Sequence, residues 1–205
     1  MRIFVGCSAS DYIPKKYFDD CKIFLEELFR NGYDLVYGAC NEGIMGLSYD
    51  IACNYNREVI GIYPEVYKNK SNNINCTKVH RDTISERTND LINFSDIFLF
   101  LHGGIGTIYE LFSAIEFKRA GEFNKPIIIY NSCGYYDKML DLLELTYNED
   151  FALRIVEENY YVCDNASDAI KYVESFDYNK NKIKKRIWLT CGSLLKKYRN
   201  IVEKK

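Results

Sequence analysis

The sequence contains few of the residues that mark several large classes of protein. Only three prolines, one tryptophan and two histidines occur in 205 residues, which excludes collagen-like and proline-rich disordered chains. The two histidines, His80 and His102, have no carboxylates at metal-ligand spacing, so no metal site is predicted. No apolar run approaches the ~20 residues of a membrane span, and the start at Met1 lacks the basic segment and long apolar stretch of a signal peptide. We therefore expect a cytoplasmic protein without a membrane partner.

A large excess of charge is also missing. The 27 Lys and Arg against 29 Asp and Glu give a formal net charge of −2, whereas nucleic-acid-binding proteins usually carry a strong basic excess. No nucleic-acid partner is therefore expected. The eight cysteines include no C-x-x-C pair and are scattered through segments of core-like periodicity. This arrangement favours reduced cysteines that act as small hydrophobic residues over a disulfide framework or a zinc site.

What the chain does have is the composition of one globular domain. Hydrophobic residues make up 47% of it, with 18 Tyr and 12 Phe, and its length suits a single core. We predict one domain over residues 1–178, followed by a basic extension over residues 179–205. Lysines and arginines surround the apolar segment Ile187–Leu195 in this extension. A solvated helix or docked tail is the favoured interpretation, and a polyanion-binding arm is the alternative.

Short apolar runs alternate with segments of helical period. The predicted strands are Arg2–Gly6, Leu35–Tyr37, Val59–Tyr63, Ile97–Leu101, Ile127–Tyr130 and Tyr160–Cys163. The predicted helices are Lys15–Arg30, Ile44–Tyr55, Ile84–Phe94, Thr107–Arg119, Tyr136–Tyr147 and Ala166–Ser175. The alternation predicts an α/β fold, a Rossmann-like, doubly wound parallel sheet flanked by helices, with ligands beyond the carboxyl ends of the strands. The polar stretch Pro64–Thr83 is predicted to be a mobile loop, either one that covers a site or an insertion without a role.

The strongest functional signal is a glycine-rich turn between a predicted strand and a predicted helix. It consists of Gly103, Gly104, Ile105, Gly106 and Thr107. Glycines let the backbone approach an anion, and the helix start offers free N–H groups and a positive dipole end, so a phosphate suits this position. Thr107 and Glu110 have the spacing of a capping box, which is the structural explanation for them. The functional explanation places the Glu110 carboxylate near the sugar of a bound nucleotide, with His102 at the mouth of the site.

Two further small-residue loops follow predicted strands. The loop after the second strand contains Gly38 and Asn41, and it either approaches a ligand or packs the strand tightly against the next helix. The loop after the first strand contains Ser8, but Ser10 stands where a G-x-S-x-G nucleophile motif requires glycine. This loop also lacks the G-x-G-x-x-G fingerprint, which argues against a dinucleotide-dependent oxidoreductase. Because such loops converge in a doubly wound sheet, all three are expected to contribute to one site.

The block from Arg87 to Tyr136 resembles the LOG family, the cytokinin riboside 5′-monophosphate phosphoribohydrolases formerly named lysine decarboxylases. The family motif P-G-G-x-G-T-x-x-E is matched by Gly103, Gly104, Gly106, Thr107 and Glu110. Further matches are Arg87 in M-x-x-R-K, Ser95-Asp96 in S-D-x-x-x-x-L, Lys125-Pro126 in K-P and Gly134-Tyr135-Tyr136 in G-Y-Y. The departures are His102 for the proline, Ile84 and Thr88 for the methionine and lysine that flank the arginine, and Ala39-Cys40 for two glycines of the second-strand loop. The resemblance covers about residues 1–145.

The resemblance implies a hydrolase that releases a free base and ribose 5-phosphate from a nucleoside 5′-monophosphate, without a cofactor and as a homodimer. Glu110 would stabilise the charge on the sugar, and Arg87 would hold the phosphate or the leaving base. Taken alone, Arg87 would be a solvated residue paired with Glu86 or Asp90. The residues expected to bind substrate are Gly103, Gly104, Ile105, Gly106, Thr107, Thr88, Ser8, Gly38 and Asn41. The alternative is a catalytically silent nucleotide-binding or sensing module of the same fold, which the altered positions Thr88 and Ala39-Cys40 favour.

Overall fold

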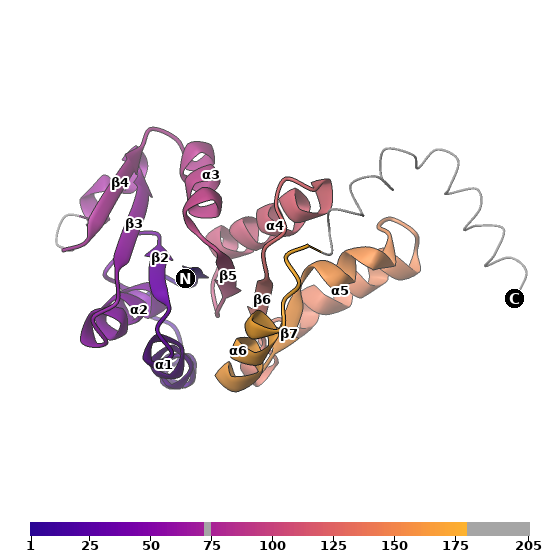
Figure 1. Cartoon of the computed structure of the whole chain (residues 1–205), viewed down its shortest axis with the longest axis horizontal. Coiled ribbons are helices and arrows are strands. Elements are labelled where there is room, and N and C mark those ends of the chain that lie inside the picture. Colours follow the sequence, from indigo (N-terminus) through magenta and orange to yellow (C-terminus); the bar gives the residue numbers. More distant parts are fainter. Residues whose placement is uncertain (72–74, 180–205) are drawn as a thin grey trace, which may run out of the picture.

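The computed structural model describes residues 1–71 and 75–179, in which seven parallel strands form one sheet in the order β4-β3-β2-β1-β5-β6-β7. The strands are β1 (Arg2–Gly6), β2 (Asp34–Tyr37), β3 (Val59–Pro64), β4 (Thr77–Arg81), β5 (Ile97–Phe100), β6 (Ile127–Tyr130) and β7 (Tyr161–Cys163). The chain starts in the middle of the sheet, builds outward to β4, returns to β5 beside β1, and then builds outward to β7 (Figure 1). The predicted Rossmann-like, doubly wound fold is confirmed. The predicted basic extension lies outside the described residues from residue 180 onward.

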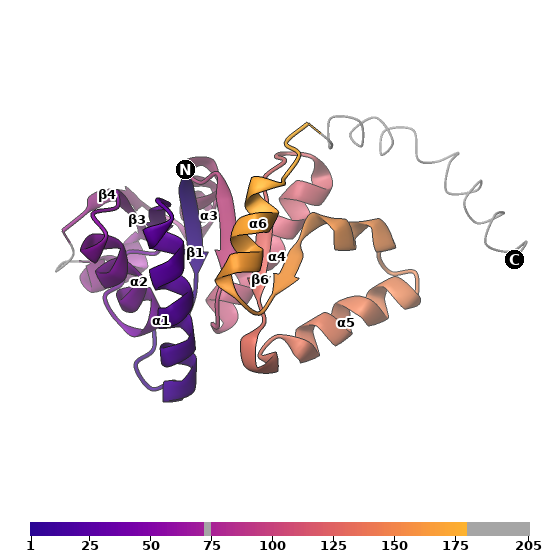
Figure 2. The ribbon, with the colours of Figure 1, turned by 60° about the horizontal axis from the view of Figure 1, so that its bottom comes forward.

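Helices cover both faces of the sheet. They are α1 (Lys15–Arg30), α2 (Gly43–Asn54), α3 (Ile84–Phe94), α4 (Ile105–Ala120), α5 (Asp137–Asn148) and α6 (Ala166–Glu174). One face carries α1, α2 and α6, with α1 and α6 side by side in Figure 2, and the other face carries α3 and α4. Throughout residues 1–71 and 75–179, each helix is too short or too polar to cross a membrane.

Alternating strand side chains separate the interior into two cores. On β1, Ile3 and Val5 face α1, whereas Phe4 faces α3 and α4. The Phe4 ring meets the Phe100 ring edge-on, with 5.7 Å between their centroids. Full burial of each such side chain is worth roughly 1.5–3 kcal/mol before the conformational entropy cost of folding, so the two cores hold the helices firmly on both faces of the sheet.

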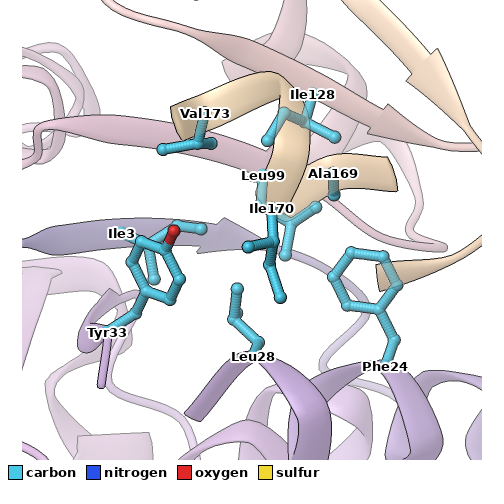
Figure 3. A pocket seen from close by; sticks show the side chains of 9 residues that line it. All are labelled: Ile3, Phe24, Leu28, Tyr33, Leu99, Ile128, Ala169, Ile170 and Val173. Carbon is cyan, nitrogen blue, oxygen red and sulfur yellow. The ribbon is translucent and has the colours of Figure 1, made fainter. Parts of the chain in front are cut away.

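An apolar seam between α1, α6 and the sheet belongs to the first of these cores (Figure 3). It is lined by Ile3, Phe24, Leu28, Tyr33, Leu99, Ile128, Ala169, Ile170 and Val173. The seam is too tightly packed to admit a water molecule, and none of the residues predicted to bind substrate lines it. It is therefore a packing contact that anchors α6.

The prediction of a loop over Pro64–Thr83 is wrong. This stretch contains a 3-10 helix, Glu65–Ser71, and the edge strand β4, which pairs with β3 from Ile60 opposite Thr77 to Pro64 opposite Arg81. As an edge strand, β4 buries little of its side-chain surface and so has a polar sequence. Exposed charged residues are common on edge strands because they discourage pairing with other chains. Its strand character comes from backbone pairing with β3, which hydrophobic periodicity does not report.

The cysteines of the described residues are free thiols. Cys7, Cys21, Cys40 and Cys163 are buried, which agrees with the prediction that they serve as small hydrophobic residues. Cys53 and Cys133 are exposed, and Cys76 is half-buried. The eighth cysteine, Cys191, lies outside the described residues.

Candidate functional site

The loops after β1, β2 and β5 meet at the carboxyl edge of the sheet, where its strand order reverses between β1 and β5. The backbone N–H of Ser8, after β1, donates to the carbonyl of His102, after β5, over 2.9 Å. The Ser8 carbonyl in turn accepts from the N–H of Met45, in the first turn of α2, over 3.0 Å. The predicted convergence of the three loops is thus present, at the position where doubly wound sheets form a ligand crevice.

The start of α4 differs from the prediction. The helix begins at Ile105 with Gly104 as its N-cap residue, so Thr107 stands in the first turn and does not cap the helix. The structural explanation of Thr107 and Glu110 as a capping box is therefore wrong, because the helix begins at Ile105, two residues before the predicted start at Thr107. Among the described residues no side chain caps α4. Its first N–H groups have no partners within the helix, and they remain available to an anion.

The glycines at this helix start have two different roles. A Cβ atom on Gly103 would lie 2.1 Å from the Thr107 hydroxyl oxygen, so the absence of a side chain there allows the turn to pack. A Cβ atom on Gly104 or Gly106 would meet no described atom within 4 Å. Together with Ile105, which is 83% exposed, Gly104 and Gly106 leave the N-terminus of α4 open. The open surface therefore coincides with the unpartnered N–H groups.

Arg87 and Glu110 form a buried ion pair beside this opening. The guanidinium Nη1 of Arg87 donates to Oε1 of Glu110, and its Nε donates to the carbonyl of Ile62 in β3 over 3.2 Å. Each residue is 8% exposed. Burying a charged side chain is costly unless it is paired with an opposite charge and hydrogen-bonded. The two buried charges therefore depend on each other. Arg87 is thus neither solvated nor paired with Glu86 or Asp90.

Gly38 makes room for this ion pair. A Cβ atom there would lie 2.6 Å from the Nη2 atom of Arg87, so the glycine after β2 lets the guanidinium pass between α3 and α4. This is a packing role within the site, and it supports the interpretation that the loop packs tightly. The next residue, Ala39, has a φ of 55°, a left-handed conformation that glycine adopts without strain.

Three other residues predicted to bind substrate, Thr88, Ser8 and Asn41, do not contact the pair of Arg87 and Glu110 through any hydrogen bond of the described residues. Thr88 is buried, and its hydroxyl donates to the Ile84 carbonyl over 2.9 Å. The hydroxyl proton of Thr88 is therefore already bonded within α3. The Ser8 hydroxyl accepts from the N–H of Ser10 over 3.2 Å. Asn41 is exposed in the loop before α2. The described structure thus brings Arg87 and Glu110 together at the α4 start, while the hydroxyls of Thr88 and Ser8 have partners within their own segments.

The N-terminus of α2 is already occupied by a carboxylate, which the sequence did not reveal. Oδ1 of Asp11 accepts from the N–H of Gly43, the first residue of α2, over 2.7 Å. A negative charge at this helix end would repel a phosphate. Of the two glycine loops, the one before α4 is therefore the better anion site. Nothing in the spacing of Asp11, 32 residues before Gly43, could have predicted this contact.

The prediction that His102 lies at the mouth of the site is wrong. Its side chain is 2% exposed and points into a cluster that joins α1 to the segment after β6. Nδ1 lies 3.4 Å from Sγ of Cys21, and Nε2 lies 3.2 Å from the Ser132 carbonyl oxygen. The ring centroid lies 4.7 Å from that of Tyr17. His102 is thus a core residue that fixes the back of the glycine loop.

The burial of His102 predicts a pH-dependent stability. Burial lowers the pKa of His102 below its ordinary value of 6.5. Below about pH 6.5 the unfolded chain therefore binds more protons than the folded chain, and the free energy of unfolding should fall until the lowered pKa is passed. Above about pH 6.5, His102 is uncharged in both states and does not change the free energy of unfolding further. Urea unfolding between about pH 7.5 and pH 5 measures the effect.

The matched variants are His102→Gln and His80→Gln. His102→Gln should lose part of the acid sensitivity, whereas His80→Gln should keep it. The comparison uses the slope of stability against pH, because the absolute stability of His102→Gln also reflects lost packing. Equal slopes for wild type and His102→Gln would contradict the prediction.

One other feature of the described residues, a hollow, lies outside this site. A hollow of about 290 Å³ is lined by Leu140, Asp141, Glu144, Tyr147, Glu157, Tyr160 and Val162. Within residues 1–71 and 75–179, no group of three or more His, Cys, Asp and Glu side chains is arranged to hold a metal ion. Cys7, after β1, lies near Glu110: burial, the Cys21 thiol and then the Glu110 carboxylate raise the pKa of Cys7. The Cys7 thiol is therefore an uncharged neighbour of the ion pair.

Comparison with known protein families identifies the family of the chain. The family model described as "possible lysine decarboxylase" matches residues 45–173, more than half of the chain and a range that includes Arg87 and Glu110. The chain belongs to this family, the LOG family. The resemblance noted in the sequence is thus confirmed.

Curated LOG proteins of plants align along most of the chain. The cytokinin riboside 5′-monophosphate phosphoribohydrolase LOG1 of Arabidopsis thaliana is 29% identical over 191 residues, which cover 91% of this chain and 88% of that protein. The probable cytokinin riboside 5′-monophosphate phosphoribohydrolase LOGL6 of Oryza sativa subsp. japonica is 28% identical over 185 residues, 89% of this chain and 74% of that protein. The LOG relatives therefore span the sheet and both of its helical layers.

Solved structures share the fold at lower identity. The molybdenum cofactor binding protein from Rippkaea orientalis has a TM-score of 0.63 and 19% identity, covering 85% of this chain and 95% of that one. The Moco carrier protein from Chlamydomonas reinhardtii has a TM-score of 0.62 and 17% identity, covering 85% of this chain and 96% of that one. At these identities the likeness shows the Rossmann-like fold alone.

Proposed function

We propose that this LOG-family protein is a hydrolase of the phosphoribohydrolase kind, which cleaves the N-glycosidic bond of a nucleoside 5′-monophosphate and releases a free base and ribose 5-phosphate. The observation that carries the proposal is the buried pair of Arg87 and Glu110 beside the open N-terminus of α4. The names of the curated relatives, phosphoribohydrolases at 28–29% identity, support the same reaction class.

The geometry of α4 suits a ribose 5-phosphate. Gly106 and Glu110 stand four residues apart and so lie on one face of the helix, about 6 Å apart along its axis. Helical side chains lean toward the N-terminus, which brings the Glu110 carboxylate closer to the first turn. A phosphate held by the first N–H groups would leave the ribose over this face of the helix. The phosphate then positions the sugar, and the carboxylate faces the reacting bond.

The chemistry follows from the charge that develops during cleavage. As the bond between C1′ and the base nitrogen lengthens, positive charge builds on the sugar ring, and a nearby carboxylate stabilises it. The base leaves with the bonding electrons, water adds to C1′, and a proton of that water passes to the base. Arg87 holds Oε1 of Glu110, so that the carboxylate keeps one orientation. No step requires a redox cofactor.

Base release from a panel of purine and pyrimidine nucleoside 5′-monophosphates, followed by chromatography, tests the proposal. The corresponding nucleosides without phosphate serve as controls. The wild-type protein should release base from at least one nucleotide and leave its nucleoside intact. Nucleotide binding without base release from any member of the panel would contradict the proposed reaction.

Gly106→Ala should weaken substrate use without weakening the fold. The added methyl group meets no described atom within 4 Å, and alanine favours the helix over glycine by up to about 1 kcal/mol. It would nevertheless stand over the first turn, where the phosphate is proposed to bind. We expect KM to rise about 10- to 100-fold because the phosphate is displaced. Ser113→Ala, on the same helix beyond Glu110, is the control. An unchanged KM in Gly106→Ala would argue against this phosphate position.

The alternative is nucleotide binding without turnover. It is favoured by Thr88, which stands where the family motif has a lysine and whose hydroxyl is bonded within α3. It predicts saturable nucleotide binding with no base release. The panel experiment separates the two functions, because binding and release are followed on the same nucleotides.

A further inference from the structure

Three successive carbonyl groups of the loop before α4 accept hydrogen bonds from other segments of the chain. The Leu101 carbonyl accepts from the Tyr136 hydroxyl over 2.5 Å, and the Gly103 carbonyl accepts from the Tyr135 hydroxyl over 2.8 Å. The carbonyl between them accepts from the backbone N–H of Ser8 over 2.9 Å. The two tyrosines are neighbours just before α5, which is not otherwise part of the site. Their hydroxyls therefore determine which way the loop peptides face.

The hydrogen bond from the Tyr135 hydroxyl to the Gly103 carbonyl determines the direction of the Gly104 N–H group. In a trans peptide, the carbonyl and the N–H that follows it point in opposite directions. Because the Gly103 carbonyl points at Tyr135, the N–H of Gly104 points away from it. Glycines resist such rotation weakly, since they populate both signs of φ. If the peptide between Gly103 and Gly104 turned over, a carbonyl oxygen would stand where the N–H now lies and would repel an anion.

The turn after β6 is built to place the two tyrosines. Oδ1 of Asn131 accepts from the N–H of Tyr136 over 2.6 Å, and its Nδ2 donates to Asp137 over 2.8 Å, so one side chain secures the start of α5. Cys133 and Gly134 have φ values of 55° and 64°, which turn the chain sharply before the tyrosines. Such left-handed backbone costs a non-glycine residue like Cys133 on the order of 1 kcal/mol, and the surrounding structure must compensate for it.

Both hydroxyls remain donors over the working range of pH. Burial raises the pKa of Tyr135 and that of Tyr136 above the ordinary value of 10.0. The Tyr135 ring also packs edge-on against Tyr17, with 5.4 Å between centroids. Phenylalanine can keep that ring contact, so Tyr135→Phe removes the hydrogen bond to Gly103 and little else.

We propose that Tyr135 is a positioning residue of the phosphate site: its hydroxyl fixes the peptide between Gly103 and Gly104, so that the N–H of Gly104 faces the substrate phosphate. This inference rests on the proposed function, which places a phosphate at the start of α4. Tyr135 acts through the loop, and no contact of Tyr135 with the reacting bond is invoked. Tyr136 supports the same loop one peptide earlier.

The matched control is Tyr160→Phe. The Tyr160 hydroxyl bonds to the Tyr147 hydroxyl over 3.2 Å, so this variant also loses one tyrosine hydrogen bond, but away from the loop. Calorimetric binding of adenosine 5′-monophosphate and of adenosine is measured for both variants and the wild type. Tyr135→Phe should bind the nucleotide about 3- to 10-fold more weakly, the effect of one lost hydrogen bond, and should bind adenosine as the wild type does. Equal weakening in Tyr160→Phe, or none in Tyr135→Phe, would overturn the proposal.

Kinetics supply the second readout. For any nucleotide that the wild type hydrolyses, Tyr135→Phe should raise KM while kcat stays within about twofold, because the Glu110 carboxylate is untouched. A general structural defect would lower kcat and the thermal midpoint together. A fall in kcat with an unchanged KM would overturn the proposal.

A third readout requires no substrate. The carbonyl-carbon resonance of Gly103 and the amide resonance of Gly104 are recorded by NMR in the unliganded protein. Both should move in Tyr135→Phe and not in Tyr160→Phe. If the wild type released no base from any nucleotide, the proposed function would fail, and these resonances together with nucleotide binding would still decide the role of Tyr135. Unmoved resonances would overturn it whatever the activity of the wild type.

Discussion

Replacing Glu110 by glutamine is expected to lower kcat for base release by at least about 100-fold while nucleotide binding persists. Glutamine has the shape of glutamate and can still accept the hydrogen bond from Arg87, so the side chain stays in place. It carries no negative charge, and so it cannot offset the positive charge that builds on the sugar ring. The phosphate contacts at the start of α4 are unaffected, which is why binding should survive.

Base release, nucleotide affinity and the free energy of unfolding are measured together for this variant. Loss of the carboxylate leaves Arg87 buried without a counter-charge, so a loss of stability of about 1–3 kcal/mol is also expected. Glu116→Gln is the control, because Glu116 lies on the same helix and pairs with an arginine, Arg119, but is exposed. Near-wild-type kcat in a folded Glu110→Gln protein would remove Glu110 from the mechanism.

Replacing Gly103 by alanine is expected to destabilise the fold and to abolish measurable nucleotide binding. The new Cβ atom would lie 2.1 Å from the Thr107 hydroxyl oxygen and 2.6 Å from the Thr107 Cβ atom. Rotating the threonine side chain moves its hydroxyl but not its Cβ atom, so the backbone of the turn must shift. Overpacking of this kind costs about 1–3 kcal/mol, and the shift displaces the N–H groups that hold the phosphate.

A second-site test separates this clash from other causes. Thr107→Gly removes the Cβ atom that Gly103→Ala would strike, so the double variant should regain part of the lost stability, less about 1 kcal/mol for glycine in a helix. Thr107→Ala keeps the Cβ atom and should not rescue. Equal rescue by both, measured by urea unfolding, would show that the hydroxyl alone is the obstacle, contrary to the expectation.

Several residues that carry the family resemblance have structural roles. Oδ2 of Asp96 accepts from the N–H of Arg2 over 2.9 Å and so joins β5 to the start of β1. The Lys125 ammonium donates to the carbonyls of Ile92 and Ser95 over 2.8 and 2.6 Å and closes the C-terminus of α3. Both contacts hold the strand and helix that lead into the glycine loop. They join the two halves of the sheet without forming the site itself.

The sequence alone determined the alternation of strands and helices, and with it the doubly wound sheet. Buried strands and amphipathic helices report their periods directly in their apolar residues. It also predicted the position of the glycine turn, which lies between β5 and α4, and it singled out Glu110 as the proposed catalytic residue, because the motif has a defined spacing. The edge strand β4 was not predicted from the sequence, because its stability comes from pairing with β3 and not from its own side chains.

Only the tertiary structure decided which side chains face one another. Arg87 and Glu110 are 23 residues apart in sequence, and their pairing depends on the space that Gly38 leaves beside β2. The capping of α2 by Asp11 and the burial of His102 are likewise long-range contacts. A linear pattern reports the neighbours of a residue along its own helix or strand, whereas these contacts join loops from different strands. For that reason the sequence predicted where the candidate site lies, and the packing of the sheet decided which charged side chains face one another there.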